Sequence, residues 1–226
     1  MKINIAIDGP SAAGKSTIAK KLCEKLGYVH LDTGAMYRCT ALKAIRKGIS
    51  LTDEPAVCAM LECTDIQLTP DGKVFLDGED VSHEIREDAV SMAASDVSKL
   101  QNVRRDLVRR QQKMAEARGF IMDGRDIGTV VLPDAEVKIY MTASAHARAL
   151  RRLKQNQETG IDTSDLETIE KEIEARDYQD MHREHSPLVK AEDAVEIDTS
   201  DLSIEEVVDR IYQLAVPFLE QEECVK

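Results

Sequence analysis

The chain is short of positive charge. It carries 30 lysines and arginines against 42 aspartates and glutamates, which gives a formal net charge of −12. Nucleic acid and anionic membranes both need a basic face, so neither is an expected partner. The sequence also lacks a long apolar run and a charged leader segment, so we expect neither membrane insertion nor export. The expected location is the cytoplasm.

Close groups of metal-binding or disulfide-forming residues are also missing. The five cysteines are scattered and odd in number, which does not predict a disulfide framework or a cysteine metal site. His182 and His185 are three residues apart, but no third ligand is near them in sequence. No repeat, coiled coil or low-complexity tail is present. The length of 226 residues suits one α/β domain with a modest insert, and a monomer is the working expectation.

The most informative motif lies near the start. Residues 9–16 read Gly-Pro-Ser-Ala-Ala-Gly-Lys-Ser, a complete G-x-x-x-x-G-K-[ST] phosphate loop after the apolar run Ile3–Ile7. Glycines let the backbone turn its N–H groups onto phosphate, Lys15 reaches the β- and γ-oxygens, and the Ser16 hydroxyl completes a Mg²⁺ shell. A glycine turn without ligand is the alternative, but the strand-loop-helix context favours a nucleoside triphosphate site. The residues expected to bind the triphosphate here are Gly9, Pro10, Ser11, Ala12, Ala13, Gly14, Lys15, Ser16 and Thr17.

Short apolar segments alternate with amphipathic helical patterns along the chain. This alternation predicts an α/β fold with a parallel five-stranded core sheet flanked by helices, in which ligands bind at the carboxyl ends of the strands. The residues that follow the segments are polar, as such a site requires. The expected strands are Ile3–Ile7, Val29–Leu31, Phe120–Met122, Val137–Met141 and Ala194–Ile197.

Residues 66–81 break this alternation. They alternate apolar and polar residues around turn sequences, which predicts a small antiparallel insert. A helical pattern from Ile85 to Ala117 then returns the chain to the core. Capping-box sequences predict helices starting at Ser164 and Ser203. The polar stretch 154–163 reads either as a short lid over the triphosphate or as an ordinary connection between helices.

Absent motifs narrow the class of phosphate-loop protein. The chain has no Asn-Lys-x-Asp, no Asp-x-x-Gly and no Leu-Ser-Gly-Gly-Gln, so guanine switches and transporter ATPases are not indicated. A kinase for a small acceptor remains. Eleven of the fifteen arginines lie between Arg104 and Arg183, and cations around both phosphates suit phosphoryl transfer. Arg176, Asp180 and Arg183 share one face if helical, a spacing that a salt-bridged surface would also show.

Together with the phosphate loop, three further motifs resemble the bacterial cytidylate kinase family. They read Leu-Asp-Thr-Gly-Ala-Met-Tyr-Arg at 31–38, Asp-Gly-Arg-Asp-Ile-Gly-Thr-Val at 123–130, and Arg-Asp-x-x-Asp-x-x-Arg at 176–183. The resemblance covers nearly the whole chain. It implies a single phosphate-loop kinase domain over residues 1–226, with a nucleoside-monophosphate-binding insert at about 62–100 and a short lid at about 152–165. It also implies transfer of the ATP γ-phosphoryl group to CMP or dCMP.

The resemblance assigns roles position by position. Arg38 and Arg125 hold the acceptor phosphate, Arg176 and Asp180 address the ribose, and Arg183 neutralises transferring charge, so that Lys15, Arg125 and Arg183 form the catalytic set. Ser95, Arg104 and Asp126 read the cytosine, whose exocyclic amine donates to a carboxylate or hydroxyl. Thr33 stands where many members of the family carry serine. Arg151 and Arg152 lie on the donor phosphates. Some relatives carry glycine at the position of Ser16, so its direct contact with Mg²⁺ is predicted from the general phosphate loop. Asp123, which ends an apolar strand, is expected to bind the ion through water.

Two kinds of alternative stay open at this point. Another small kinase, for UMP, AMP or shikimate, would share the loop and the sheet. A noncatalytic nucleotide sensor would bind ATP and signal through the insert at 66–81.

Overall fold

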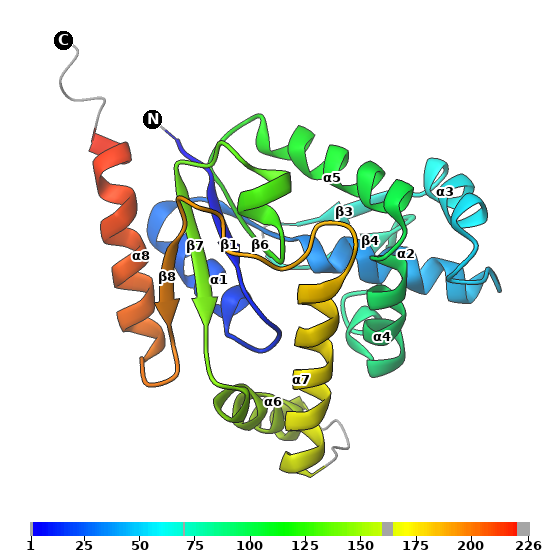
Figure 1. Cartoon of the computed structure of the whole chain (residues 1–226). Coiled ribbons are helices and arrows are strands. Elements are labelled where there is room, and N and C mark those ends of the chain that lie inside the picture. The colour runs from blue at the N-terminus through cyan, green and yellow to red at the C-terminus, as the bar shows by residue number, and fades with distance from the viewer. Residues whose placement is uncertain (1, 70, 160–164, 221–226) are drawn as a thin grey trace. The chain divides into compact units, whose positions relative to one another are not determined.

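The computed structural model describes residues 2–69, 71–159 and 165–220 (Figure 1). Contacts divide the chain into two units. The first, which we call the phosphate-loop unit, comprises Met1–Tyr28 and Arg118–Lys226; the second, the inserted unit, comprises Val29–Ala117.

The main sheet has five strands in the order β2-β6-β1-β7-β8. Strand β1 pairs in parallel with β6 and β7, and β7 pairs in parallel with β8. The expected parallel core sheet is therefore confirmed, with strand ends within three residues of those predicted. The strands are β1 (Ile5–Asp8), β2 (Val29–Asp32), β6 (Phe120–Gly124), β7 (Val137–Thr142) and β8 (Val195–Asp198).

The register of the sheet brings polar residues to one edge of the phosphate-loop unit. Asp8 lies opposite Gly124 on one side and Tyr140 on the other, and Thr142 lies opposite Asp198. Because all these strands run in the same direction, the segments after β1, β6, β7 and β8 leave the sheet together. This edge carries the phosphate loop.

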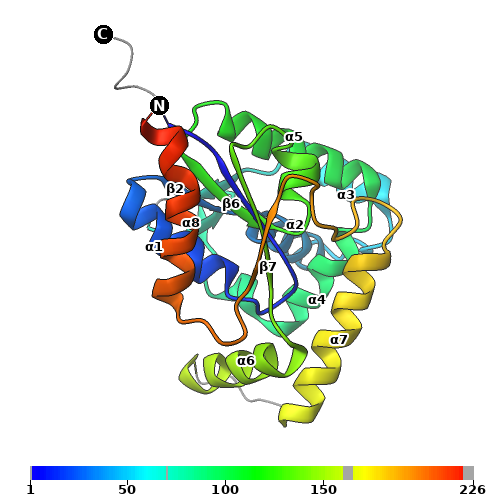
Figure 2. The same ribbon diagram turned by 60° about the vertical axis from the view of Figure 1, so that its left-hand side comes forward.

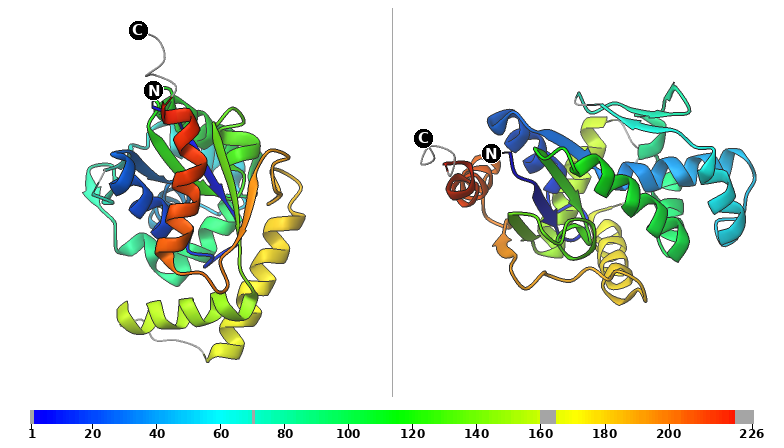
Figure 3. Two further views of the ribbon diagram at one scale, coloured as in Figure 1. Left: turned by 90° about the vertical axis from the view of Figure 1, so that its left-hand side faces the viewer. Right: turned by 90° about the horizontal axis from the view of Figure 1, so that it is seen from above.

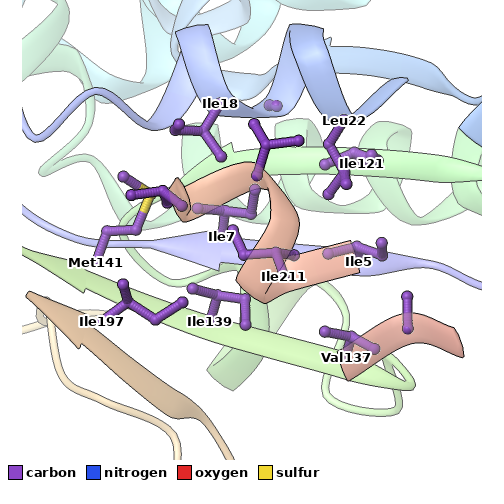
Figure 4. Close-up of a cluster of buried hydrophobic side chains, with 14 of the residues drawn as sticks. Ile5, Ile7, Ile18, Leu22, Ile121, Val137, Ile139, Met141, Ile197 and Ile211 are labelled. Carbon is purple, nitrogen blue, oxygen red and sulfur yellow. The ribbon is translucent and has the colours of Figure 1, made fainter. Parts of the chain in front are cut away.

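The core of the phosphate-loop unit fills with branched aliphatic side chains, as expected for a sheet buried on both faces. Ile5 and Ile7 of β1 and Ile139 of β7 have at most 1% of their surface exposed. Figure 4 shows them beside Ile18 and Ile211, which come from α1 (Lys15–Leu26) and α8 (Ile204–Leu219). Figure 2 shows α8 running the length of the strands.

Helices α6 (Ala145–Thr159) and α7 (Leu166–His182) form a second pair in this unit. They pack through Ala149, Ile169 and Ile173, each at most 4% exposed. Figure 3 (left) shows α6 at the end of the unit where β7 terminates, with α7 leading away from it. A π-helical turn, η2 (Ile127–Val131), follows β6.

The inserted unit contains the antiparallel sheet predicted at 66–81. Its strands β3 (Ile66–Leu68), β4 (Val74–Leu76) and β5 (Glu79–Asp80) pair in that order. The helical pattern predicted at about 85–117 is confirmed as three helical segments, which are separated where the backbone is extended at Glu87 (ψ 145°) and Leu100 (ψ 115°). The helices of this unit are α2 (Thr33–Arg46), α3 (Glu54–Glu62), η1 (Glu84–Arg86), α4 (Asp88–Val97) and α5 (Gln101–Ala115).

Three predicted helix boundaries differ in how well the structure matches them. The capping box at Ser203 is confirmed, with Glu206 as its partner. Ser164 lies outside the described residues, and α7 is instead capped by Asp165, whose carboxylate accepts from the Thr168 N–H at 2.9 Å. The polar stretch after Arg152 is not a loop up to residue 159, because α6 continues through it. Long polar side chains favour helix, so composition alone misleads there.

None of the helices in the described ranges has both the length and the apolar character needed to span a membrane.

Candidate active site

The phosphate loop follows β1 directly and has the backbone that its glycines permit. Gly14 has φ 89° and forms the N-cap of α1, a left-handed conformation that other residues adopt at a cost. Gly9 has φ 149°, and a Cβ on it would lie 2.1 Å from the Met141 carbonyl oxygen. Only glycine fits at that approach. The N-terminus of α1 therefore opens onto the loop, as an anion site requires.

Lys15 is folded into this loop and is only 6% exposed. Its ammonium donates to the carbonyl oxygens of Gly9 (2.8 Å) and Pro10 (2.7 Å). Burial, together with the charge of Arg125, lowers the pKa of Lys15 to about 7. A buried cation without a full countercharge is a favourable partner for a triphosphate.

Ser16 and Asp123 meet at the start of α1. The Ser16 hydroxyl donates to Asp123 Oδ2 at 2.7 Å, across 107 residues of sequence, and Asp123 is 5% exposed. A hydroxyl and a carboxylate are hard oxygen ligands of the kind that Mg²⁺ prefers, so this pair fits the ion. Within the described ranges, no cluster of three or more histidine, cysteine or acidic residues forms a self-sufficient metal site. A metal held here would take its other ligands from water and phosphate.

Arg125 and Asp180 form an ion pair between β6 and α7. Arg125 Nε donates to Asp180 Oδ2 at 2.7 Å, and their side chains are 20% and 10% exposed. Burial alone would raise the pKa of the Asp180 carboxyl, but Arg125 holds it below its usual value, with help from Arg176 and Arg183. Three arginines thus act on Asp180, while Asp177 and Asp123 also lie close enough to act on Arg125.

Arg183 lies one residue beyond the helix that carries Arg176 and Asp180. Helix α7 ends at His182, and Arg183 is its C-cap with ψ 145°. Its guanidinium donates to the Ser186 carbonyl and lies 3.9 Å from Asp126 Oδ1. Arg183 therefore lies close to Asp126 as well as acting on Asp180.

Two arginines of α6 lie beside the phosphate loop. Arg148 is 5% exposed, donates to the carbonyls of Ala143 (2.9 Å) and Ser11 (3.2 Å), and pairs with Asp177 of α7 at 2.6 Å. Arg152 Nη2 lies 3.5 Å from the Ser11 hydroxyl. Arg148 therefore braces the loop and Arg152 lies beside it.

Arg151 contacts the segment after β8. It donates to the Thr199 hydroxyl at 3.1 Å and also to the Thr199 carbonyl. The same hydroxyl lies 3.4 Å from the Ala13 carbonyl of the phosphate loop. A single threonine thus connects an arginine of α6 to the loop.

The inserted unit holds the remaining predicted residues. Arg38 Nη2 donates to Asp32 Oδ2 at 2.7 Å, while Asp32 caps α2 by accepting from Ala35 N at 3.0 Å. Arg104 is 4% exposed, donates to the Ser98 carbonyl at 3.2 Å, and stacks 5.5 Å from the Tyr37 ring centroid. Thr33 is the first residue of α2 and 4% exposed. Ser95 is half-buried on α4.

The comparison with protein families decides the relationship. The family model described as Cytidylate kinase matches residues 5–216. The chain belongs to the cytidylate kinase family. A protein named cytidylate kinase from Caldicellulosiruptor bescii is 53% identical over 216 residues, covering 94% of this chain and 95% of the relative. One of the same name from Bacillus subtilis (strain 168) is 52% identical over 215 residues, covering 94% and 96%.

A solved structure supports the fold of this cytidylate kinase family member independently. An uncharacterised protein from Eubacterium ventriosum ATCC 27560 superimposes with a TM-score of 0.51 at 13% identity, covering 94% of this chain and 97% of that one. This likeness concerns architecture only.

Sequence reasoning gave no role to three carboxylates in this family member. Asp8 accepts from the backbone N–H groups of Ile127 and Gly128, Asp177 pairs with Arg148, and Asp32 pairs with Arg38. Asp8 and Asp32 are the last residues of β1 and β2, so they lie among the polar residues that the sequence placed at the strand ends. The only signal for Asp177 was its place between Arg176 and Asp180.

Proposed function

We propose that this protein transfers the γ-phosphoryl group of ATP to CMP and dCMP, forming ADP with CDP or dCDP. The observation that carries the proposal is a complete phosphate loop in the same unit as a second arginine cluster around Asp180. One anion site suits the donor and the other suits an acceptor phosphate. The identity of the acceptor is supported by relatives that carry the name cytidylate kinase at 53% and 52% identity.

The donor site is proposed to be the phosphate loop, Gly9 to Thr17, with Arg151 and Arg152. Lys15 would leave the Gly9 and Pro10 carbonyls and donate to the phosphate oxygens, where its charge offsets the negative charge that moves onto ADP. In the transfer, an acceptor phosphate oxygen forms a bond to the γ-phosphorus. The bond from that phosphorus to the bridging oxygen breaks, and its electron pair leaves with ADP. The attacking oxygen is already ionised, so no general base is assigned.

Mg²⁺ is the proposed cofactor, with Ser16 as a direct ligand and Asp123 acting through water. When bound, the ion would neutralise the donor phosphates and hold them in line. The 2.7 Å contact between Ser16 and Asp123 supports the pairing of these two residues.

The residue roles at the acceptor are proposed for each unit by itself. In the phosphate-loop unit, Arg125 would bind the acceptor phosphate, Asp126 the cytosine amine, and Arg176 and Asp180 the ribose. Arg183 would neutralise transferring charge. In the inserted unit, Arg38 would bind the phosphate while Thr33, Ser95 and Arg104 contact the nucleoside. Against Asp126, uracil presents a carbonyl where cytosine has an amine, and an unmatched polar contact costs about 1–3 kcal/mol.

The organisation expected from the resemblance remains part of the proposal. The chain would act as a single kinase domain and as a monomer in the cytoplasm, with the acceptor insert at about 62–100. Part of the lid expected at about 152–165 lies outside the described residues, and the remainder belongs to the last turns of α6.

The test is ADP formation from Mg·ATP with CMP, dCMP, UMP, AMP, GMP, TMP and shikimate offered separately, beside a reaction without acceptor. Turnover concentrated on CMP and dCMP is the expected result. Preference for another acceptor would contradict the roles proposed for the base-reading residues. ATP binding without acceptor-dependent formation of ADP would favour a nucleotide sensor.

Asp126→Ala sharpens this test within one assay. The variant should lose kcat/KM for CMP by about 10- to 100-fold and much less for UMP, because only cytosine offers the amine. An equal loss on both substrates would remove Asp126 from base recognition.

A further inference from the structure

The last residue of β1 holds the chain that follows β6. Asp8 is 4% exposed, and its two carboxylate oxygens accept from consecutive backbone N–H groups. Oδ1 accepts from Ile127 and Oδ2 from Gly128, both at 2.7 Å. A hydrogen bond of this length to a charged acceptor is among the stronger ones in proteins. One side chain therefore fixes two successive peptide groups.

These two residues follow Arg125 and Asp126 without a gap. The Asp126 carbonyl accepts from Val130 at 2.9 Å and from Val131 at 3.2 Å, which closes the π-helical turn η2. Asp126 is thus held from its carbonyl by the turn and through the next two N–H groups by Asp8. Its φ and ψ of −142° and 28° lie outside the regular helix and strand regions.

We propose that Asp8 is a positioning residue that sets the orientation of Asp126, and through it the preference for cytosine over uracil. The inference rests on the proposed function, because it assigns base reading to Asp126. The main chain of Asp8 leads directly into Gly9 of the phosphate loop, while its side chain holds the two residues that follow Asp126.

An ionised carboxylate is the group that this geometry requires. An asparagine has one acceptor oxygen and one amide, so it would leave one of the two N–H groups facing another donor. The charge on Asp8 does not stabilise the fold. Burial raises the pKa of Asp8 to about 6, and the charge of Asp126 adds to the rise. Nearby Lys15 and the two N–H groups oppose it. A buried charge that costs folding energy is expected where it positions functional groups.

The experiment compares Asp8→Asn with Asp209→Asn. Asp209 makes an exposed ion pair with Lys25 at 2.6 Å on the surface of α8 and gives the same chemical change away from the site. At pH 7.5, Asp8→Asn should lower kcat/KM for CMP by about 10- to 100-fold and for UMP by less than about 3-fold. The affinity for ATP should stay within about 3-fold, and Asp209→Asn should match the parent throughout.

Three outcomes would overturn the inference. One is a loss of equal size on CMP and UMP in a folded Asp8→Asn, and another is a kcat/KM that matches the parent on both substrates. The third is that Asp8→Asn and Asp8→Ala both fail to fold at 20 °C, which would assign Asp8 to folding alone. A direct measurement on the parent accompanies these: through-hydrogen-bond NMR couplings from the Ile127 and Gly128 nitrogens to the Asp8 carboxyl carbon should be present.

The parent enzyme separates the two proposals. If it shows no preference for CMP over UMP, the proposed function has failed. If it shows the preference and Asp8→Asn retains it, the positioning role alone has failed.

Discussion

Two ion pairs, one from each unit, hold their cations in opposite environments. In the phosphate-loop unit, Arg148 pairs with Asp177 at 2.6 Å with side chains 6% and 12% exposed. In the inserted unit, Arg46 pairs with Glu79 at 2.7 Å with side chains 36% and 60% exposed. The two distances differ by only 0.1 Å, but the first pair has lost most of its hydration.

The difference teaches what each network does. A buried pair depends on both partners, because removing one leaves an unpaired charge away from water. An exposed pair contributes little to the free energy of unfolding, because water screens the attraction and solvates either partner alone. The phosphate-loop unit therefore concentrates charge where it can act on anions, at a cost in stability, whereas the ion pairs of the inserted unit at Arg46 join α2 to β5 and η1.

The largest expected effect comes from Lys15→Met. Loss of the ammonium should lower kcat by about 10²–10³-fold, since a preorganised cation at the transferring phosphate is removed. The same change should raise the free energy of unfolding by on the order of 1–3 kcal/mol, because a buried charge is replaced by an apolar side chain. Steady-state kinetics measures the change in kcat, and urea denaturation measures the change in the free energy of unfolding. Unaltered turnover would remove Lys15 from the donor site.

Arg148→Met tests the buried pair itself. It leaves the Asp177 carboxylate buried without its cation, so the free energy of unfolding should fall by about 3–5 kcal/mol. The double variant Arg148→Met, Asp177→Leu should recover most of that loss in the same denaturation experiment. If the single variant is as stable as the parent, the contrast between the units is wrong.

The pH dependence of Asp8 gives the next effect in size. Its pKa is raised to about 6 in the folded state from an ordinary 3.8, so the folded protein binds the proton more tightly than the unfolded chain does. The stability that this provides is fully present below pH 3.8 and is lost as pH rises through 6, about 3 kcal/mol in total. Between pH 5 and pH 7.5, about 1–2 kcal/mol of it should disappear from the parent and not from Asp8→Asn. Parallel curves for the two proteins would contradict the shift.

The smallest expected effect is at the exposed network. Arg46 also contacts Glu84, yet Arg46→Ala should lower the Tm by less than about 3 °C, because each pair is solvated. Kinase activity should be unchanged. A drop comparable to that of Arg148→Met in differential scanning calorimetry would erase the distinction between the two units.

The sequence predicted elements where the evidence is local. The five core strands and the antiparallel insert follow from periodicity, and the phosphate loop follows from eight adjacent residues whose conformations only glycine and small residues allow. Errors occurred where an end depends on distant packing. Composition did not predict the break at Leu100, the continuation of α6 to Thr159, or the exit of Arg183 from α7.

Arg110 shows the same limit on a single side chain. A solvated helix face is the ordinary expectation for an arginine, and Arg109 meets it with a side chain that is 79% exposed. Arg110 is 26% exposed and donates to the carbonyls of Leu61 and Thr64. Its place three residues after the buried Leu107 turns it toward the inner face of α5. The carbonyls that it contacts lie 46 and 49 residues away along the chain.

By itself, the sequence determined the class of fold, the phosphate loop and the family, because each of these is written in residues close together along the chain. The tertiary structure alone decided which charges meet. Ser16 reaches Asp123 across 107 residues, Arg125 reaches Asp180 across 55, and Asp8 reaches Ile127 and Gly128 across 119 and 120. Such pairs form because parallel strands end at one edge of the sheet. The distance between the partners along the chain does not predict that they are in contact.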